Sequence, residues 1–296
     1  MVSTAPNVKT KSVKSRSFFQ DATRRFFRNR LAVVGFAIVA AFLLAAIFAP
    51  WIAPFRYDEA YFDRVRLFPF QHPEHPFGTD DVGRDYLSRL IYGARTSLMV
   101  SLFVQGIAVL IGVPLGALGG YFGGRIDFVI TRIIDIMTAF PSLLFAILVS
   151  SVMSGGFRTV VVALSITSWI TIARLTRAQM LSLREQDYVS AAKALGASQW
   201  RIIAQHIMPN ALSPLLVAVT FGIPATIFAE AGLSFLGFGV NDPIASWGKM
   251  VGDSSAYVRV YWHMALFPTL AIALTMLGFS FMGDGLRDAL DPKQEM

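Results

Sequence analysis

The chain has 296 residues, of which 54% are hydrophobic and only 15% are charged, and its mean hydropathy is +0.55. A soluble domain usually has about a quarter of its residues charged, so this composition argues against that class. The sequence has no cysteine, which excludes disulfides, thiolate metal sites and a cysteine nucleophile. Apolar runs of about 20 residues recur without alternating polarity, so we expect an all-α polytopic membrane protein and not a membrane β-barrel.

The net charge of +7 is concentrated at the N-terminus. Residues 1–30 contain eight basic side chains and one acidic side chain, which accounts for the whole net charge. A basic stretch directly before an apolar run is typical of a cytoplasmic flank held near anionic lipid, and we predict no nucleic-acid partner. The first apolar run, 31–52, is longer than the apolar part of a signal peptide, so we predict a retained span.

Six membrane-spanning helices are predicted from the apolar runs, and basic residues in the short loops place both termini in the cytoplasm. The predicted spans are 31–52, 96–120, 126–153, 159–181, 211–235 and 262–284. The chain would then divide into a basic cytoplasmic segment (1–30), a first span with an outer loop (31–95), and a core of five spans (96–290) with a cytoplasmic loop at about 184–210.

Two acidic residues lie in or near the predicted spans, where an unpaired charge is costly. Asp135 follows Arg132 by three residues, and an ion pair between them is the favoured interpretation. Pro141 is expected to loosen the helix after Asp135, as a bend that could serve gating. Glu230 is expected either to bond to the following loop or to line a vestibule. Asp135, Pro141 and Glu230 are therefore the candidate gate residues.

Small residues form a regular series in the second span, Gly112-x-x-x-Gly116-x-x-x-Gly120. Such a series permits close approach of a neighbouring helix. Packing within this chain is the favoured interpretation, and packing against a second subunit is the alternative.

Three other kinds of site are not expected. His72 and His75 stand in a proline-rich outer loop, which is weak evidence for a metal site, and we predict none. The phosphate-binding pattern GxxxxGK[ST] does not occur, so the chain is not expected to bind ATP. No clustered catalytic set is present, and we predict no enzymatic activity.

The polar stretch from Tyr188 to Asn210 separates the fourth and fifth spans. Its Ala-Ala, Gly and Pro residues have a spacing that resembles the cytoplasmic coupling loop of ABC importer permeases. The matching residues are Ala191, Ala192, Gly196 and Pro209, and the departures are Ser190 for the usual Glu, His206 for Ile and Met208 for Leu. An ordinary amphipathic cytoplasmic loop is the alternative.

A short helix is expected in this loop, with Tyr188, Ala192 and Leu195 on one face at i, i+4 and i+7. Gly196 is predicted to end this helix. The resemblance implies that the loop contacts an ATPase through Ser190, Ala191, Ala192, Lys193, Leu195, Gly196 and Pro209.

A second stretch, His75 to Leu98, is similar to the segment before the second span in the dipeptide, oligopeptide and nickel branch of these permeases. Its signature residues in the outer segment are Gly78, Thr79, Asp80, Gly83, Arg84, Asp85, Ser88 and Arg89. This motif is more specific than the coupling-loop motif, and it indicates which branch of the permeases the chain resembles.

The resemblance, which covers about residues 20–290, implies the type I ABC importer permease fold in a bacterial cytoplasmic (inner) membrane. It implies a C-type subunit that pairs with a B-type sister permease, two ABC ATPase subunits and an extracytoplasmic substrate-binding protein. ATP and Mg would be bound by the ATPase subunits, so no cofactor is expected in this chain. Small peptides are the expected substrate. The alternatives are a nickel-chelate importer and a secondary transporter driven by protons through Asp135 and Glu230.

Overall fold

The computed structural model describes residues 18–290. Most of the N-terminal basic segment, which was predicted to be cytoplasmic, lies outside this range. Within it the chain is helical, with isolated β-bridges but no strands. The helices are α1 (Phe18–Arg28), α2 (Arg30–Ile47), α3 (Ala49–Ile52), α4 (Tyr86–Phe122), α5 (Gly124–Thr138), α6 (Ser142–Val152), α7 (Phe157–Leu183), α8 (Asp187–Ala194), α9 (Gln199–Arg201), η1 (Ile202–Ile207), α10 (Met208–Phe235), α11 (Trp247–Ser254), η2 (Ser255–Tyr257) and α12 (Trp262–Leu290).

Five helical stretches of residues 18–290 are long and apolar enough to cross a membrane, and a sixth crossing is possible if the bent pair α5–α6 is one span. This agrees with the six predicted spans. The second begins earlier than expected, because Asp85 caps α4 by accepting a 2.7 Å hydrogen bond from the backbone N–H of Ser88. The helix therefore includes the last signature residues.

The predicted third span is broken. We expected one helix over 126–153 with a bend, but α5 ends at Thr138, α6 begins at Ser142, and their axes differ by 80°. Pro141 lies in the break with extended backbone (ψ 123°). Proline has no N–H to donate and disfavours helical backbone in the residue before it, so the helix stops there.

The glycine series of α4 packs against α7 of the same chain, as the favoured prediction had it. A Cβ atom on Gly112 would lie 2.7 Å from the carbonyl oxygen of Trp169, and one on Gly120 would lie 2.6 Å from that of Arg177. Gly116 meets Ala173 and Thr176 just as closely. The absence of side chains on this face allows the two backbones to approach.

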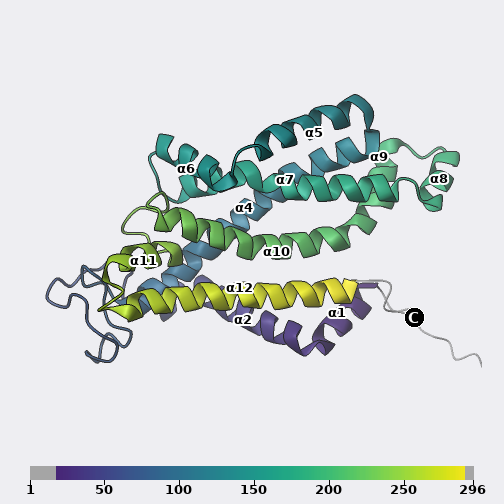
Figure 1. Ribbon diagram of the computed structural model, residues 1–296. Coiled ribbons are helices and arrows are strands. Elements are labelled where there is room, and N and C mark those ends of the chain that lie inside the picture. The colour runs from purple at the N-terminus through teal and green to yellow at the C-terminus, as the bar shows by residue number, and fades with distance from the viewer. Residues whose placement is uncertain (1–17, 291–296) are drawn as a thin grey trace, which may run out of the picture.

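The remaining long helices lie alongside this pair. In Figure 1, α10 and α12 run the length of the molecule, α4 crosses behind them, α1 and α2 lie beside α12, and α5 and α6 lie on the opposite side. We call the end with the loop 53–85, residues 236–261 and α11 the loop end. The opposite end, residues 184–210 with α8 and α9, is the coupling end (Figure 1).

Candidate functional site

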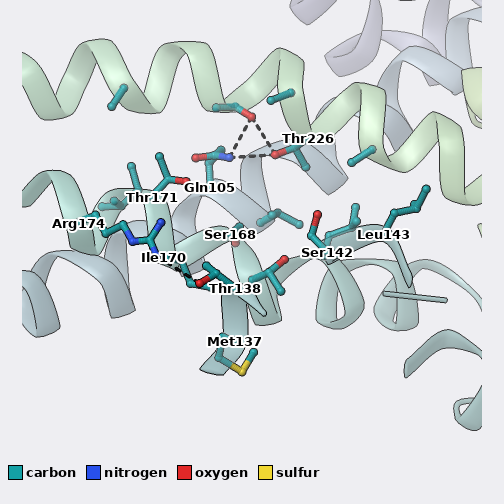
Figure 2. A pocket seen from close by; sticks show the side chains of 18 of the residues that line it. Gln105, Met137, Thr138, Ser142, Leu143, Ser168, Ile170, Thr171, Arg174 and Thr226 are labelled. Carbon is teal, nitrogen blue, oxygen red and sulfur yellow. Dashed lines mark hydrogen bonds between the residues drawn. The ribbon is translucent and has the colours of Figure 1, made fainter. Parts of the chain in front are cut away.

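A cavity of about 750 Å³ lies between α4, the α5–α6 break, α7 and α10. Its wall is mostly apolar, and its polar side chains are Gln105, Thr138, Ser142, Thr167, Ser168, Thr171, Arg174 and Thr226. Most of them are labelled in Figure 2. Because the helix is broken at Pro141, short polar side chains on both sides of the break reach this space. The cavity is a candidate site for a solute in the spanning part of the chain.

Two polar contacts organise the cavity wall. Gln105 donates from Nε2 to the carbonyl oxygen of Gly222 (3.0 Å) and to Thr226 Oγ1 (2.9 Å), which connects α4 to α10 (Figure 2). Arg174 donates from Nη2 to Thr138 Oγ1 at 3.3 Å. Neither Gln105 nor Arg174 was predicted from the sequence as a site residue. A polar amide in the middle of an apolar run was the signal that could have identified Gln105.

The three candidate gate residues have different positions. Pro141 lines the cavity, whereas Asp135 and Glu230 do not. The predicted ion pair between Arg132 and Asp135 is wrong: no salt bridge joins these two described residues, and the Arg132 guanidinium lies 5.3 Å from the ring centroid of Phe128. The Asp135 side chain is exposed on the surface of α5.

Glu230 is completely buried, and serine hydroxyls of α4 and of its own helix bond to it. Its two carboxyl oxygens accept hydrogen bonds from Ser97 Oγ of α4 (3.1 Å) and Ser234 Oγ of α10 (2.8 Å). Ser97 Oγ also accepts from the backbone N–H of Trp247 in α11 at 3.3 Å. Through Ser97, Glu230 is linked to α11 at the loop end, and its role at a gate stays a prediction.

At the coupling end, α8 ends as the sequence predicts. Gly196 has φ +80°, its N–H donates to the carbonyl oxygen of Lys193, and the N–H of Ala197 donates to that of Ala192, both at 3.0 Å. This pattern of two bonds around a left-handed glycine is the Schellman motif. The space around Gly196 is open, so its backbone conformation and not crowding favours glycine here.

The three residues predicted for one face of α8 differ in burial. Ala192 is buried with Val189 in a cluster with residues of α7 and η1, whereas Tyr188 is exposed. Leu195 is 88% exposed. The remaining residues assigned to the coupling loop are all exposed: Ser190, Ala191, Lys193, Gly196 and Pro209. The inward side therefore anchors α8, and the outward side is available to a partner.

The coupling end is joined directly to the end of α4. Arg184 donates from Nη1 to the carbonyl oxygens of Gly120 (3.0 Å) and Tyr121 (3.3 Å). The rings of Phe122 and Trp200 pack edge to face with centroids 5.8 Å apart. These contacts connect the loop that carries α8 to α4, a helix that lines the cavity.

All eight signature residues of the outer segment are buried at the loop end. Arg84 pairs with Asp80 and, at 3.1 Å, with Asp242 beyond α10. Arg89 Nε lies 3.2 Å from the same Asp80 carboxylate, and its Nη1 donates to the carbonyl oxygen of Pro243. Lys249 of α11 lies 3.1 Å from Asp242. The signature therefore fastens the outer loop to α4 and α11.

The other signature residues support the loop backbone. Thr79 Oγ1 accepts from the N–H of Leu67 at 2.9 Å, and Ser88 Oγ accepts from that of Phe55 at 3.0 Å. Gly78 and Gly83 have positive φ and lie against the backbone of neighbouring loop residues.

Charge pairing at this end lowers the pKa of the exposed Asp242 carboxylate. Burial alone would raise the pKa of Asp242, but hydrogen bonds and charge from Lys249 and Arg84 hold that pKa below its ordinary value. Asp242 is therefore ionised at neutral pH and bridges two cations.

Comparison with known proteins decides the family. Residues 112–296 match the binding-protein-dependent transport system inner membrane component family, and residues 17–73 match the N-terminal TM domain of oligopeptide transport permease C. The chain belongs to this family of inner-membrane transport components. It is a multi-pass protein of the bacterial inner membrane.

Relatives over the whole chain support the assignment. The chain is 44% identical over 282 residues to the oligopeptide transport system permease protein OppC of Bacillus subtilis (strain 168), covering 95% of this chain and 92% of that protein. It is 42% identical over 290 residues to the dipeptide transport system permease protein DppC of the same strain (97% and 90%). It is 40% identical over 294 residues to the glutathione transport system permease protein GsiD of Pectobacterium atrosepticum (99% and 96%).

Solved structures show the same fold. An inward-facing structure of the MetNI methionine ABC transporter matches with a TM-score of 0.58 at 20% identity, covering 68% of this chain and 96% of that one. The fold of ABC importer transmembrane subunits, predicted from the motifs, is thereby confirmed, whereas the orientation of the termini stays a prediction.

Proposed function

We propose that the chain is one half of a heterodimeric pore that imports dipeptides or oligopeptides, driven by two separate ATPase subunits. The observation that carries this proposal is the exposed outward side of α8 in a chain of this transport family. The same chain has a cavity between its spanning helices. The names of the relatives, which include oligopeptide and dipeptide permeases, support the substrate class.

The cavity suits a solute that carries both backbone amides and varied side chains. Its polar groups are neutral except for Arg174, and the rest of the wall is apolar. Side-chain hydroxyls and the Gln105 amide can bond to peptide groups without selecting a side chain, and Arg174 can pair with a carboxylate. A B-type sister permease would close the cavity on its open side.

ATP would act through α8. In this mechanism an ATPase subunit holds the outward side of α8, and closure of the ATPase pair moves α8 together with α4, to which Arg184 connects it. Such coupling requires that the two pore states differ in their contacts with the ATPase. The loop end would receive solute from an extracytoplasmic binding protein, and no cofactor would be held by this chain.

A proton-driven secondary transporter has less support. Neither Asp135 nor Glu230 lines the cavity, and Glu230 is engaged by serine hydroxyls. A chain of intramembrane acids along the path would be the expected feature of a proton relay.

The test is purification of the complex in mild detergent followed by reconstitution into liposomes with its binding protein. We expect a sister permease and two ATPases to copurify, and a labelled tripeptide to be taken up with ATP after the proton gradient is collapsed. Uptake that needs the gradient but not ATP would contradict the proposal. Uptake of a nickel chelate but of no peptide would retain the ATP-driven pore and reject the substrate.

A further inference from the structure

His72, Glu74 and His75 form a compact cluster on the outer loop at the loop end. One potential ligand atom from each residue lies within 4.8 Å of the other two. The cluster is made by a tight turn: the N–H of His75 donates to the carbonyl oxygen of His72 at 3.1 Å, with Pro73 at the second position. Proline favours this position because its φ is already that of a turn.

The closed turn, and not the sequence spacing of the two histidines, brings their rings together. A spacing of three residues says nothing by itself, but the closed turn places the two imidazole rings with centroids only 5.6 Å apart. The glutamate between them extends from the same turn, and its Oε2 lies 3.9 Å from His72 Nδ1. Ligands about 2.0–2.2 Å from one ion are separated by a little over 3 Å, so a small side-chain rotation suffices.

His75 is held in the orientation that a metal ligand needs. Its side chain is fully buried, and its Nδ1 lies 2.9 Å from Asp85 Oδ1. An Nδ1–H donated to a carboxylate leaves Nε2 as the free lone pair. That buried Nε2 has no hydrogen-bond partner, which is costly in a folded protein and is relieved by a bound cation.

The other two residues provide access from solvent. His72 is partly exposed and Glu74 is exposed, so an ion can reach the cluster. His72 Nδ1 accepts only a long 3.3 Å hydrogen bond from the N–H of Glu74. Arg64 pairs with Oε2 of Glu74, which leaves Oε1 available to a metal.

We propose that His72, Glu74 and His75 bind a divalent transition-metal ion of the Zn²⁺ class, with water completing its coordination. Two imidazoles and one carboxylate are a common zinc ligand set, whereas Ca²⁺ and Mg²⁺ prefer oxygen alone. Asp85 acts as the outer partner that orients His75. Because Asp85 also caps α4, the ion braces the outer loop against this helix. None of the three ligands lines the cavity, so the ion is not a transported solute.

The test uses the intact transporter complex in detergent, freed of metal with EDTA and titrated with ZnCl₂ against a fluorescent chelator. The His72→Gln/Glu74→Gln double variant is compared with wild type, because both side chains are at the surface and the fold is expected to persist. We expect the double variant to lose one bound zinc per copy of this chain. The zinc-induced rise in melting temperature is expected to be lost with it. X-ray absorption of the wild type should show nitrogen and oxygen ligands only.

His206→Gln is the matched control, since it removes a histidine from the coupling end. It should bind as much zinc as the wild type. Equal zinc content and affinity in the wild type and the double variant would overturn the proposal, as would complete competition by Mg²⁺. The melting temperatures without zinc show whether the double variant is folded, so a folding defect is not mistaken for loss of a ligand.

Discussion

At the loop end, buried charged side chains pair with one another, whereas at the coupling end α8 buries small and branched apolar side chains and leaves its outward side exposed. Arg84, Arg89 and Asp80 pair within the chain, and Lys249 and Asp242 extend the network to α11. This network joins the outer loop to α4 and α11 without a partner chain.

At the coupling end, the side chains of α8 are buried only on its inner side. Val189 and Ala192 are buried against α7 and η1, but Leu195 is 88% exposed at the end of α8, outside the spanning stretches. An isolated exposed leucine is ordinary, but here it is the C-cap residue, directly before the left-handed Gly196 of the Schellman motif. We infer that changes at the loop end alter stability, and changes on the outward side of the coupling end alter transport.

The largest effect is expected from Leu195→Glu. A charge on the outward side of α8 would oppose docking of an apolar groove, so ATP-dependent peptide uptake by the reconstituted complex should fall at least about tenfold. Ser190→Glu adds the same charge to an exposed position of the same helix and restores the residue usual in related coupling loops. It should retain uptake. Equal uptake by both variants, with normal ATPase copurification, would remove the coupling assignment.

The next effect is expected at the contact between α4 and α7, two long helices that lie between the two ends. Gly116→Leu introduces a side chain where α4 touches Ala173 and Thr176 of α7, and overpacking of this kind costs about 1–3 kcal/mol or more. The complex should melt at lower temperature and accumulate less in the membrane. Gly106→Leu is the matched control on the same helix, because the space around Gly106 is open. Similar melting of both variants would show that the α4–α7 contact is not tight.

A smaller effect is expected at Glu230. Glu230→Ala leaves the buried hydroxyls of Ser97 and Ser234 without their acceptor, which costs about 1–3 kcal/mol. Glu230→Gln keeps an acceptor oxygen and should cost less, and its ATP-driven uptake should be retained. Thermal unfolding of the two variants in detergent measures the difference. Loss of uptake by the stable Gln variant would instead indicate that the ionisable carboxyl takes part in transport.

The smallest effect is expected for Asp242→Asn. Its carboxylate is largely exposed, and such ion pairs contribute about 0.2–1 kcal/mol. The pKa of Asp242 is lower in the folded protein than in the unfolded chain, so its contribution is complete above the unfolded value of about 4 and disappears as pH falls through the folded value. Melting curves of wild type and variant should therefore differ at pH 7 and converge in acid. A constant difference at all pH values would contradict this.

Several features could be predicted from the sequence because they depend on local backbone or on composition. Long apolar runs must satisfy their backbone groups as helices in a membrane, which made the spans predictable. Gly196 ends α8 because only glycine takes its left-handed conformation without strain, and the regular spacing of Gly112, Gly116 and Gly120 puts one smooth face on α4. The two motifs identified the permease family.

The tertiary structure decided what depends on residues far apart in the chain. Helical spacing placed Ala192 beside Tyr188 and Leu195, but packing against α7 and η1 turned Ala192 inward. Asp135 has Arg132 in reach along the helix, yet the guanidinium of Arg132 lies over the ring of Phe128 instead.

The signature residues show the same division. The identities of these residues indicated the permease branch, but only the fold showed that all eight are buried and hold the outer loop in place. The spacing of His72 and His75 carried no information until a turn closed and Asp85, at the start of α4, oriented one ring. Sequence by itself determined the number of candidate spans, the end of α8 and the family, because these follow from backbone chemistry and residue pattern. The burial of each side chain and its partner were decided by tertiary packing, in which distant segments compete for the same contacts.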